Sequence, residues 1–222
     1  MAGSFKISEE PLIAVRRICN ERIKFARRKL PHTGQADAVH AVRKEIKKLR
    51  ALIDLVREDM DRSAYRQAKK SLRWVADTLA VSRDARVILN AFDDLARSKS
   101  HQFSPIRKHL RERCRHALRQ LAKRDFSGRA DERLRNVKRH LCCLKQPNSG
   151  WMTIQAGVAR SYQRGRQCFH QVVDNPSAEN LHAWRKAVKQ IENQLRLICP
   201  KWPQKIAETE QALARLGGNA RD

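Results

Sequence analysis

Positively charged side chains repeat along one side of the segment "VHAVRKEIKKLRALIDLV", residues 39–56. Its apolar residues are three or four positions apart, which predicts a helix with one buried stripe. At about 100° per residue, the cationic residues then fall on the opposite side of that helix. Arg can bind phosphoryl oxygens in a fork and Lys can bind them as a mobile point charge, so this side could hold an anionic ligand. The apolar residues are Val39, Val42, Ile46, Leu49, Ile53 and Val56, and the cationic ones are His40, Arg43, Lys44, Lys47 and Arg50.

A second segment, residues 178–199, repeats this arrangement 142 residues later. The preceding segments agree as well, because Arg22 and Arg164 both lie 18 residues before the first histidine of their repeat, and Lys24 and Arg166 both lie 16 residues before it. A charge run is usually a solvated face, but a solvated face has no reason to recur in register, so the repeat favours ligand binding. The apolar positions are Leu181, Trp184, Val188, Ile191, Leu195 and Ile198, and the cationic ones are His182, Arg185, Lys186 and Lys189.

The composition points to a folded protein with an anionic partner. The chain has 222 residues, with 48 Lys and Arg against 23 Asp and Glu and a formal net charge of +25. Such a chain repels itself unless a polyanion or counterions offset the charge. Hydrophobic residues make up 41%, which predicts a true core and not a disordered chain. Neither the apolar region of a signal peptide nor a run of about 18 apolar residues is present, so we expect a cytoplasmic protein.

Helical periodicity extends through nearly the whole chain, and β-branched alternation with hairpin turns is absent. The sequence therefore predicts an all-α fold and a single domain of two halves, residues 8–145 and 151–222, joined by the linker "QPNSG" at residues 146–150. Ser63 is the expected N-cap of the third helix, and "FSGRAD", residues 126–131, is an expected break. The predicted helices cover residues 8–30, 36–58, 63–80, 83–98, 104–124, 130–145, 151–173 and 178–199.

Four stretches resemble the CHAD family, the conserved histidine α-helical domains. They are "VHAVRKEIKKLRALIDL", "LRWVADTLAVSRDARVIL", "YQRGRQCF" and "LHAWRKAVK", and the likeness covers about residues 10–222. The resemblance implies a helical bundle of two pseudo-symmetric four-helix halves around a basic channel, which binds inorganic polyphosphate and is not an enzyme. The second match to "SRDARVIL" is "GNARD", residues 218–222, after which the family usually continues into another helix.

We predict that the channel is lined from both repeats. The second face should be the weaker one, because Gln190 stands where the first repeat has Lys48, and Glu192 stands where it has Arg50. Each histidine could instead pack or cap a helix, and Arg83 could instead form a structural turn pair with Asp84. The predicted polyphosphate-binding residues are Arg22, His40, Arg43, Lys44, Lys47, Lys48, Arg50, Arg73, Arg83, Arg164, His182, Arg185, Lys186 and Lys189.

Nucleic-acid binding through the same basic surface is the main alternative, because phosphate contacts supply affinity without sequence readout. The strongest candidate is the segment at residues 107–124, although only 12 of the 222 residues are aromatic and could stack on bases. Competition between DNA and polyphosphate would separate the two functions. Polyphosphate granules are the expected location if polyphosphate is the ligand. The sequence does not decide whether the chain is a monomer or a homodimer.

A phosphohydrolase is a weaker alternative. Phosphoryl transfer needs metal-holding carboxylates or a glycine-rich phosphate loop, and the acidic pairs at residues 59 and 61 and at residues 93 and 94 have no matching partners. The sequence also gives no reason to expect a cofactor or a metal. His140, Cys142 and Cys143 lie close together but have no second ligand pair with zinc-like spacing.

Overall fold

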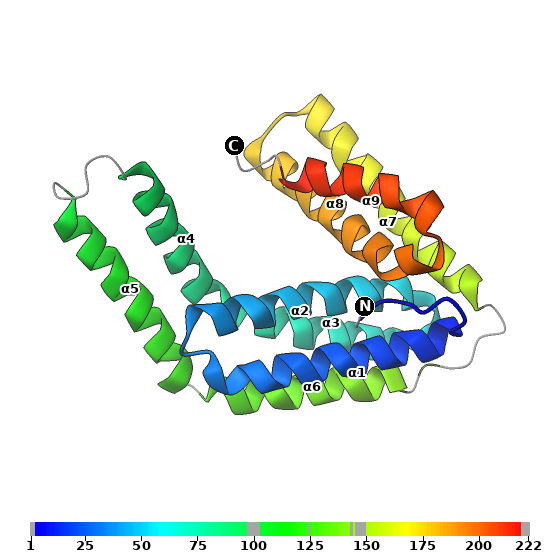
Figure 1. Cartoon of the computed structure of the whole chain (residues 1–222), viewed down its shortest axis with the longest axis horizontal. Coiled ribbons are helices and arrows are strands. Elements are labelled where there is room, and N and C mark those ends of the chain that lie inside the picture. Colours follow the sequence, from blue (N-terminus) through cyan, green and yellow to red (C-terminus); the bar gives the residue numbers. More distant parts are fainter. Residues whose placement is uncertain (1–2, 97–102, 124, 143, 145–149, 219–222) are drawn as a thin grey trace. The chain divides into compact units, whose positions relative to one another are not determined.

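The computed structural model describes residues 3–96, 103–123, 125–142, 144 and 150–218, which form helices and short connections without any strand (Figure 1). This confirms the predicted all-α fold. Single-turn 3₁₀ helices lie at Leu30–His32, Arg57–Asp59 and Cys199–Lys201. The α-helices of the described residues are α1 (Pro11–Lys29), α2 (Ala36–Leu55), α3 (Arg62–Thr78), α4 (Ala80–Leu95), α5 (Ser104–Lys123), α6 (Phe126–Cys142), α7 (Trp151–Asp174), α8 (Ala178–Ile198) and α9 (Pro203–Gly218).

The chain divides into two compact units that both contain parts of α1, α2, α3 and α6. One consists of Met1–Arg22, Lys48–Arg66 and Arg139–Asp222, and the other of Ile23–Lys47 and Gln67–Lys138. Helices α7, α8 and α9 therefore belong to the first unit, and α4 and α5 belong to the second. The predicted pseudo-symmetric halves stay a prediction, and the linker and the "GNARD" motif lie outside the described residues apart from Gly150 and Gly218.

Two predicted helix boundaries are wrong for a local reason. The third helix begins at Arg62, because the carboxylate of Asp61 accepts hydrogen bonds from the backbone N–H groups of Ser63 (2.9 Å) and Ala64 (3.2 Å). Asp61, and not Ser63, therefore caps it. The stretch "FSGRAD" does not break the chain but begins α6, since Asp125 makes the turn with a φ of 44° and accepts a hydrogen bond from the N–H of Gly128 (3.3 Å).

The first unit is held together by close packing of α7 and α8 on the C-terminal end of α2. A Cβ atom at Gly157 would lie only 2.3 Å from the carbonyl oxygen of Leu55, so only glycine permits this approach. Beside it, Nε2 of Gln190 donates to Oδ2 of Asp54 (2.8 Å), and Nη2 of Arg160 donates to the carbonyl of Asp54 (3.1 Å). These contacts hold three helices together.

The second unit has an aromatic and ionic junction between its helices. Phe126 is buried and stacks on Trp74 of α3 with ring centroids 6.0 Å apart, which explains why α6 begins there. Asp131 of α6 pairs with Arg27 of α1. Helices α4 and α5 lie side by side (Figure 1) around a small apolar cluster of Leu89, Leu110 and Cys114. No helix in the described ranges is long and apolar enough to cross a membrane.

Candidate anion-binding site

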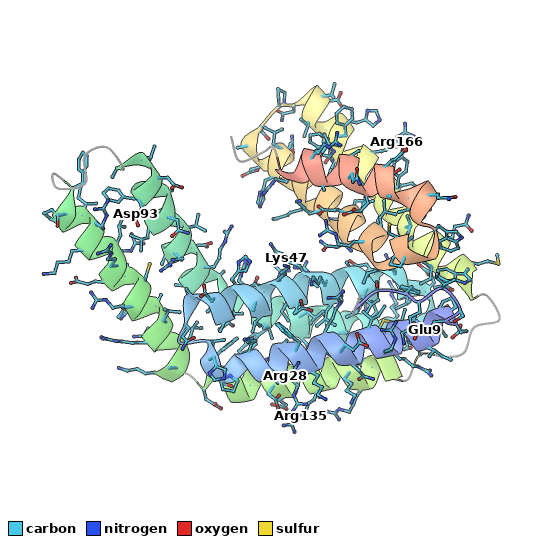
Figure 2. The ribbon with its side chains drawn as sticks, viewed as in Figure 1. Glu9, Arg28, Lys47, Asp93, Arg135 and Arg166 are labelled. Carbon is cyan, nitrogen blue, oxygen red and sulfur yellow. The ribbon has the colours of Figure 1, made fainter. Side chains whose placement is uncertain are left out.

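The first predicted basic face lies on the exposed side of α2, as the helical spacing requires. We call the residues His40, Arg43, Lys44 and Lys47 the α2 basic face. The apolar stripe of this helix is buried at all six predicted positions, which confirms that part of the prediction. His40, Lys44 and Lys47 are exposed, and Lys47 points away from α6 (Figure 2). One histidine and two lysine side chains thus face solvent within two turns of one helix.

The α2 basic face ends where the C-terminal half of α2 becomes covered. Ala51 is fully buried, and its carbonyl accepts a hydrogen bond from Nε2 of Gln194 on α8 (3.3 Å). Lys48 and Arg50 lie on the two flanks of this half and are both half-buried. The exposed cationic stretch is therefore confined to the N-terminal three turns of α2.

Arg43 lies at the edge of the α2 basic face and links α2 to α3. Its Nη1 donates to the carbonyl oxygen of Ala76 in the last turn of α3 (2.7 Å), where a positive charge is favourable. Burial lowers the pKa of Arg43, and the nearby charge of Arg83 lowers it further, while Asp84 and Asp77 act in the opposite direction. The structure therefore brings Arg43 and Arg83 into one electrostatic neighbourhood.

The other two predicted residues of this region carry acidic partners. Arg83 is exposed at the start of α4 and pairs with Asp84 (2.8 Å). Arg73 is exposed on α3 and pairs with Asp77 (3.4 Å). Exposed ion pairs of this kind are worth little in water, so an incoming phosphate can compete for either guanidinium. The repulsion between Arg43 and Arg83 would fall when an anion lies between them.

The second predicted basic face lies on α8 and differs from the first in its surroundings. We call His182, Arg185, Lys186 and Lys189 the α8 basic face. His182 and Lys186 are exposed, whereas Arg185 and Lys189 are half-buried. Lys189 pairs with Glu192 (2.7 Å), and Glu192 is itself buried and also pairs with Arg196 (2.9 Å). An acid beside this face therefore offsets part of its charge.

Two further pairs of matching residues in the repeats have different environments in the structure. Leu181 is 47% exposed, although its counterpart Val39 is buried at 3%, so the predicted apolar stripe of α8 is wrong at its first residue. Arg22 and Arg164 have different environments. Arg22 is half-buried and donates to the carbonyl of Gly3 (2.5 Å), whereas Arg164 on α7 is exposed, as is Arg166 (Figure 2).

In the described part of the chain, no three His, Cys, Asp or Glu side chains lie close enough together to hold a metal ion. The side chains of Cys142 and Cys143 are outside the described set.

The sequence did not predict that the carbonyl of Ala76 and the side chain of Asp77 lie near Arg43, because only the packing of α2 on α3 brings these groups together.

The fold and the two faces define a class of protein: an all-helical domain with two histidine-containing basic helices. The chain belongs to the CHAD family, since the family model of the CHAD domain matches residues 21–219. A solved structure, the CHAD domain from the plant Ricinus communis, is similar over 98% of this chain and 75% of that one, with a TM-score of 0.72 and 14% sequence identity. That likeness concerns the fold. A comparison with curated proteins found no match.

Proposed function

We propose that this chain binds inorganic polyphosphate and does not transform it, with the α2 basic face as the main contact surface. The observation that carries the proposal is the exposure of His40, Lys44 and Lys47 on one side of α2 in a chain of the CHAD family. A linear polyphosphate presents closely spaced phosphoryl oxygens that accept charge-assisted hydrogen bonds. Several of them can meet this row of cations at once.

Arg43 and Arg83 support the proposal from beside the row. Two guanidinium groups whose charges repel each other are more stable when an anion contacts both. The half-buried position of Arg43 also strengthens its interaction with a phosphate, because the effective dielectric constant there is below that of bulk water. The α8 basic face would add a second, weaker contact region because Glu192 offsets Lys189. A channel shared by the two faces stays a prediction.

We also propose that the chain does not catalyse a reaction of polyphosphate. This part is supported by the structural roles of acidic side chains that a phosphohydrolase would use to hold a metal ion. Asp59 accepts a hydrogen bond from the hydroxyl of Thr153 (3.1 Å), Asp61 caps α3, and Asp93 pairs with Arg107 (2.7 Å). These carboxylates are the ones that a metal-assisted phosphohydrolase would need. With polyphosphate as ligand, we further propose that the chain associates with polyphosphate granules in the cytoplasm.

A competition experiment tests the function. Long-chain polyphosphate, double-stranded DNA and RNA are compared at equal phosphate concentration in about 0.15 M salt, where weak surface attraction is screened. The proposal predicts that polyphosphate displaces a labelled polyphosphate probe at lower concentration than either nucleic acid. Equal displacement by all three would contradict it. Release of orthophosphate from polyphosphate in the presence of magnesium would contradict the non-catalytic part.

A further inference from the structure

Helix α5 carries a second row of cations that the proposed function does not use. Within the helix from Ser104 to Lys123, five basic residues lie three or four positions apart and fall within one third of its circumference. All five are exposed. We call this row the α5 stripe, and it consists of Lys108, Arg111, Arg115, Arg119 and Lys123.

The α5 stripe faces outward. The opposite side of the helix is buried through Leu110, Cys114 and Leu121. A groove of about 1020 Å³ between α4 and α5 lies along another flank, which is lined by His109 and His116 among others and does not include the stripe. The stripe is therefore a row on the outward side of α5.

The cations of the α5 stripe also lack acidic partners in the part of the chain that the structure describes. Among the described residues, no hydrogen bond or ion pair engages any of the five side chains, in contrast to the pairs made by Arg73, Arg83 and Lys189. The one acid of α5, Glu112, is exposed and lies among the stripe residues, four positions after Lys108 and three before Arg115. Within the described residues, no ion pair of the stripe therefore has to be broken before an anion can bind.

We infer that the α5 stripe is a binding surface for double-stranded nucleic acid. Its 16 residues from Lys108 to Lys123 span about 24 Å, a length over which a duplex presents many phosphates. A duplex has a persistence length of about 50 nm and meets a straight row of charges without losing conformational freedom. A flexible polyphosphate chain must be ordered to do so, and the α5 stripe, whose five side chains are all exposed, has no half-buried cation such as Arg43 to hold that chain more strongly.

A double strand fits this surface better than a single strand. Single-stranded nucleic acids are held by aromatic side chains on which the bases stack, and α5 contains no Phe, Tyr or Trp. An α-helix enters the major groove of a B-form DNA duplex, where Arg side chains reach the phosphates on both sides and the base edges. The α5 stripe shares no residue with the α2 basic face. Binding of a duplex to the stripe can therefore be tested independently of polyphosphate binding.

The test replaces Arg111, Arg115 and Arg119 together by Gln in the full chain and measures binding of a 20-base-pair DNA duplex. The control replaces His40, Lys44 and Lys47 of the α2 basic face by Gln. We expect the α5 variant to lose at least tenfold in duplex affinity and its salt slope to fall by about 2.7, since each phosphate contact contributes about 0.9. Its polyphosphate affinity should change less than twofold. An unchanged duplex affinity, or equal losses for both ligands, would overturn the inference.

A second variant tests the same surface by a gain of binding. Glu112→Gln removes the one acid of α5, and we expect the duplex to bind severalfold more tightly with a steeper salt dependence. Glu132→Gln, an equally exposed acid on α6, is the control because it changes the net charge by the same amount. Equal effects of the two substitutions would mean that only net charge matters and would overturn the inference.

Discussion

The basic faces of α2 and α8 carry the same residue types in the same order, yet they offer different charges to a ligand. In α2, Glu45 lies on the buried side of the helix, away from the cations. In α8, Glu192 lies beside the cations and pairs with Lys189 and with Arg196. The position of one acid on the helix therefore separates two faces that the spacing of the cations alone would treat as equal.

The largest difference between the faces should appear in their contributions to polyphosphate binding. Replacing His40, Lys44 and Lys47 by Gln removes three contacts of about 1 kcal/mol each, so the affinity should fall by roughly 100-fold. The corresponding change of His182, Lys186 and Lys189 should cost only about tenfold, because Glu192 already offsets Lys189. Isothermal titration with long-chain polyphosphate measures both losses, and circular dichroism verifies the fold. Equal losses would show that the pairing of Lys189 has no influence on binding.

The contact of α7 with the C-terminal end of α2 depends on Gly157. Gly157→Ala would place a Cβ atom against the backbone of Leu55, and we expect a loss of about 1–3 kcal/mol and a melting temperature lower by several degrees. The matched control is Gly165→Ala, whose Cβ would meet only the end of the Ile191 side chain at 3.0 Å. Thermal melting should show a clearly smaller effect for the control. Similar shifts would contradict the backbone contact.

Removing the acid beside the α8 basic face should make the contributions of the two faces to polyphosphate binding more similar. Glu192→Gln releases Lys189, and we expect polyphosphate to bind about threefold more tightly, with some loss of stability because Glu192 is buried. Asp131→Asn is the control, since Asp131 also holds two cations, Arg27 and Arg135, but is a residue of α6 and belongs to neither face. An equal gain in affinity from both variants would mean that net charge alone controls binding.

The smallest effect is expected at the first apolar position of the second repeat. Leu181 is exposed, so Leu181→Thr should change the free energy of unfolding by less than about 0.5 kcal/mol. Val39→Thr at the matching position should cost about 1–2 kcal/mol, because it buries a hydroxyl group. Urea unfolding of both variants measures the difference. A comparable cost at Leu181 would contradict the unequal burial of the two stripes.

Local periodicity accounts for most of what the sequence could predict. The all-α fold, the position of most helices and the buried stripe of α2 follow from apolar spacing, as does the exposure of His40, Lys44 and Lys47. The start of α6 was not predictable in this way, because Phe126 is held by Trp74, a residue far away in the sequence. A helical pattern contains no information on such partners.

The same limit applies to the candidate site. The hydrogen bond from Arg43 to the carbonyl of Ala76 joins residues 33 positions apart, and its existence depends on how α2 packs on α3. The weaker second face could be anticipated from Glu192 at the position of Arg50, but not the burial of Glu192 or its two ion pairs. The sequence predicts which charged side chains lie on each face. Their hydrogen-bond and ion-pair partners are known only from the tertiary structure.

Protection of lysines from acetylation by bound polyphosphate tests the central claim most directly. The chain is treated with an acetylating reagent with and without long-chain polyphosphate at about 0.15 M salt, and mass spectrometry measures modification at each lysine. The account predicts strong protection of Lys44 and Lys47 on the α2 basic face and little protection of Lys108 and Lys123 on α5. Equal protection of all four, or protection only on α5, would contradict it.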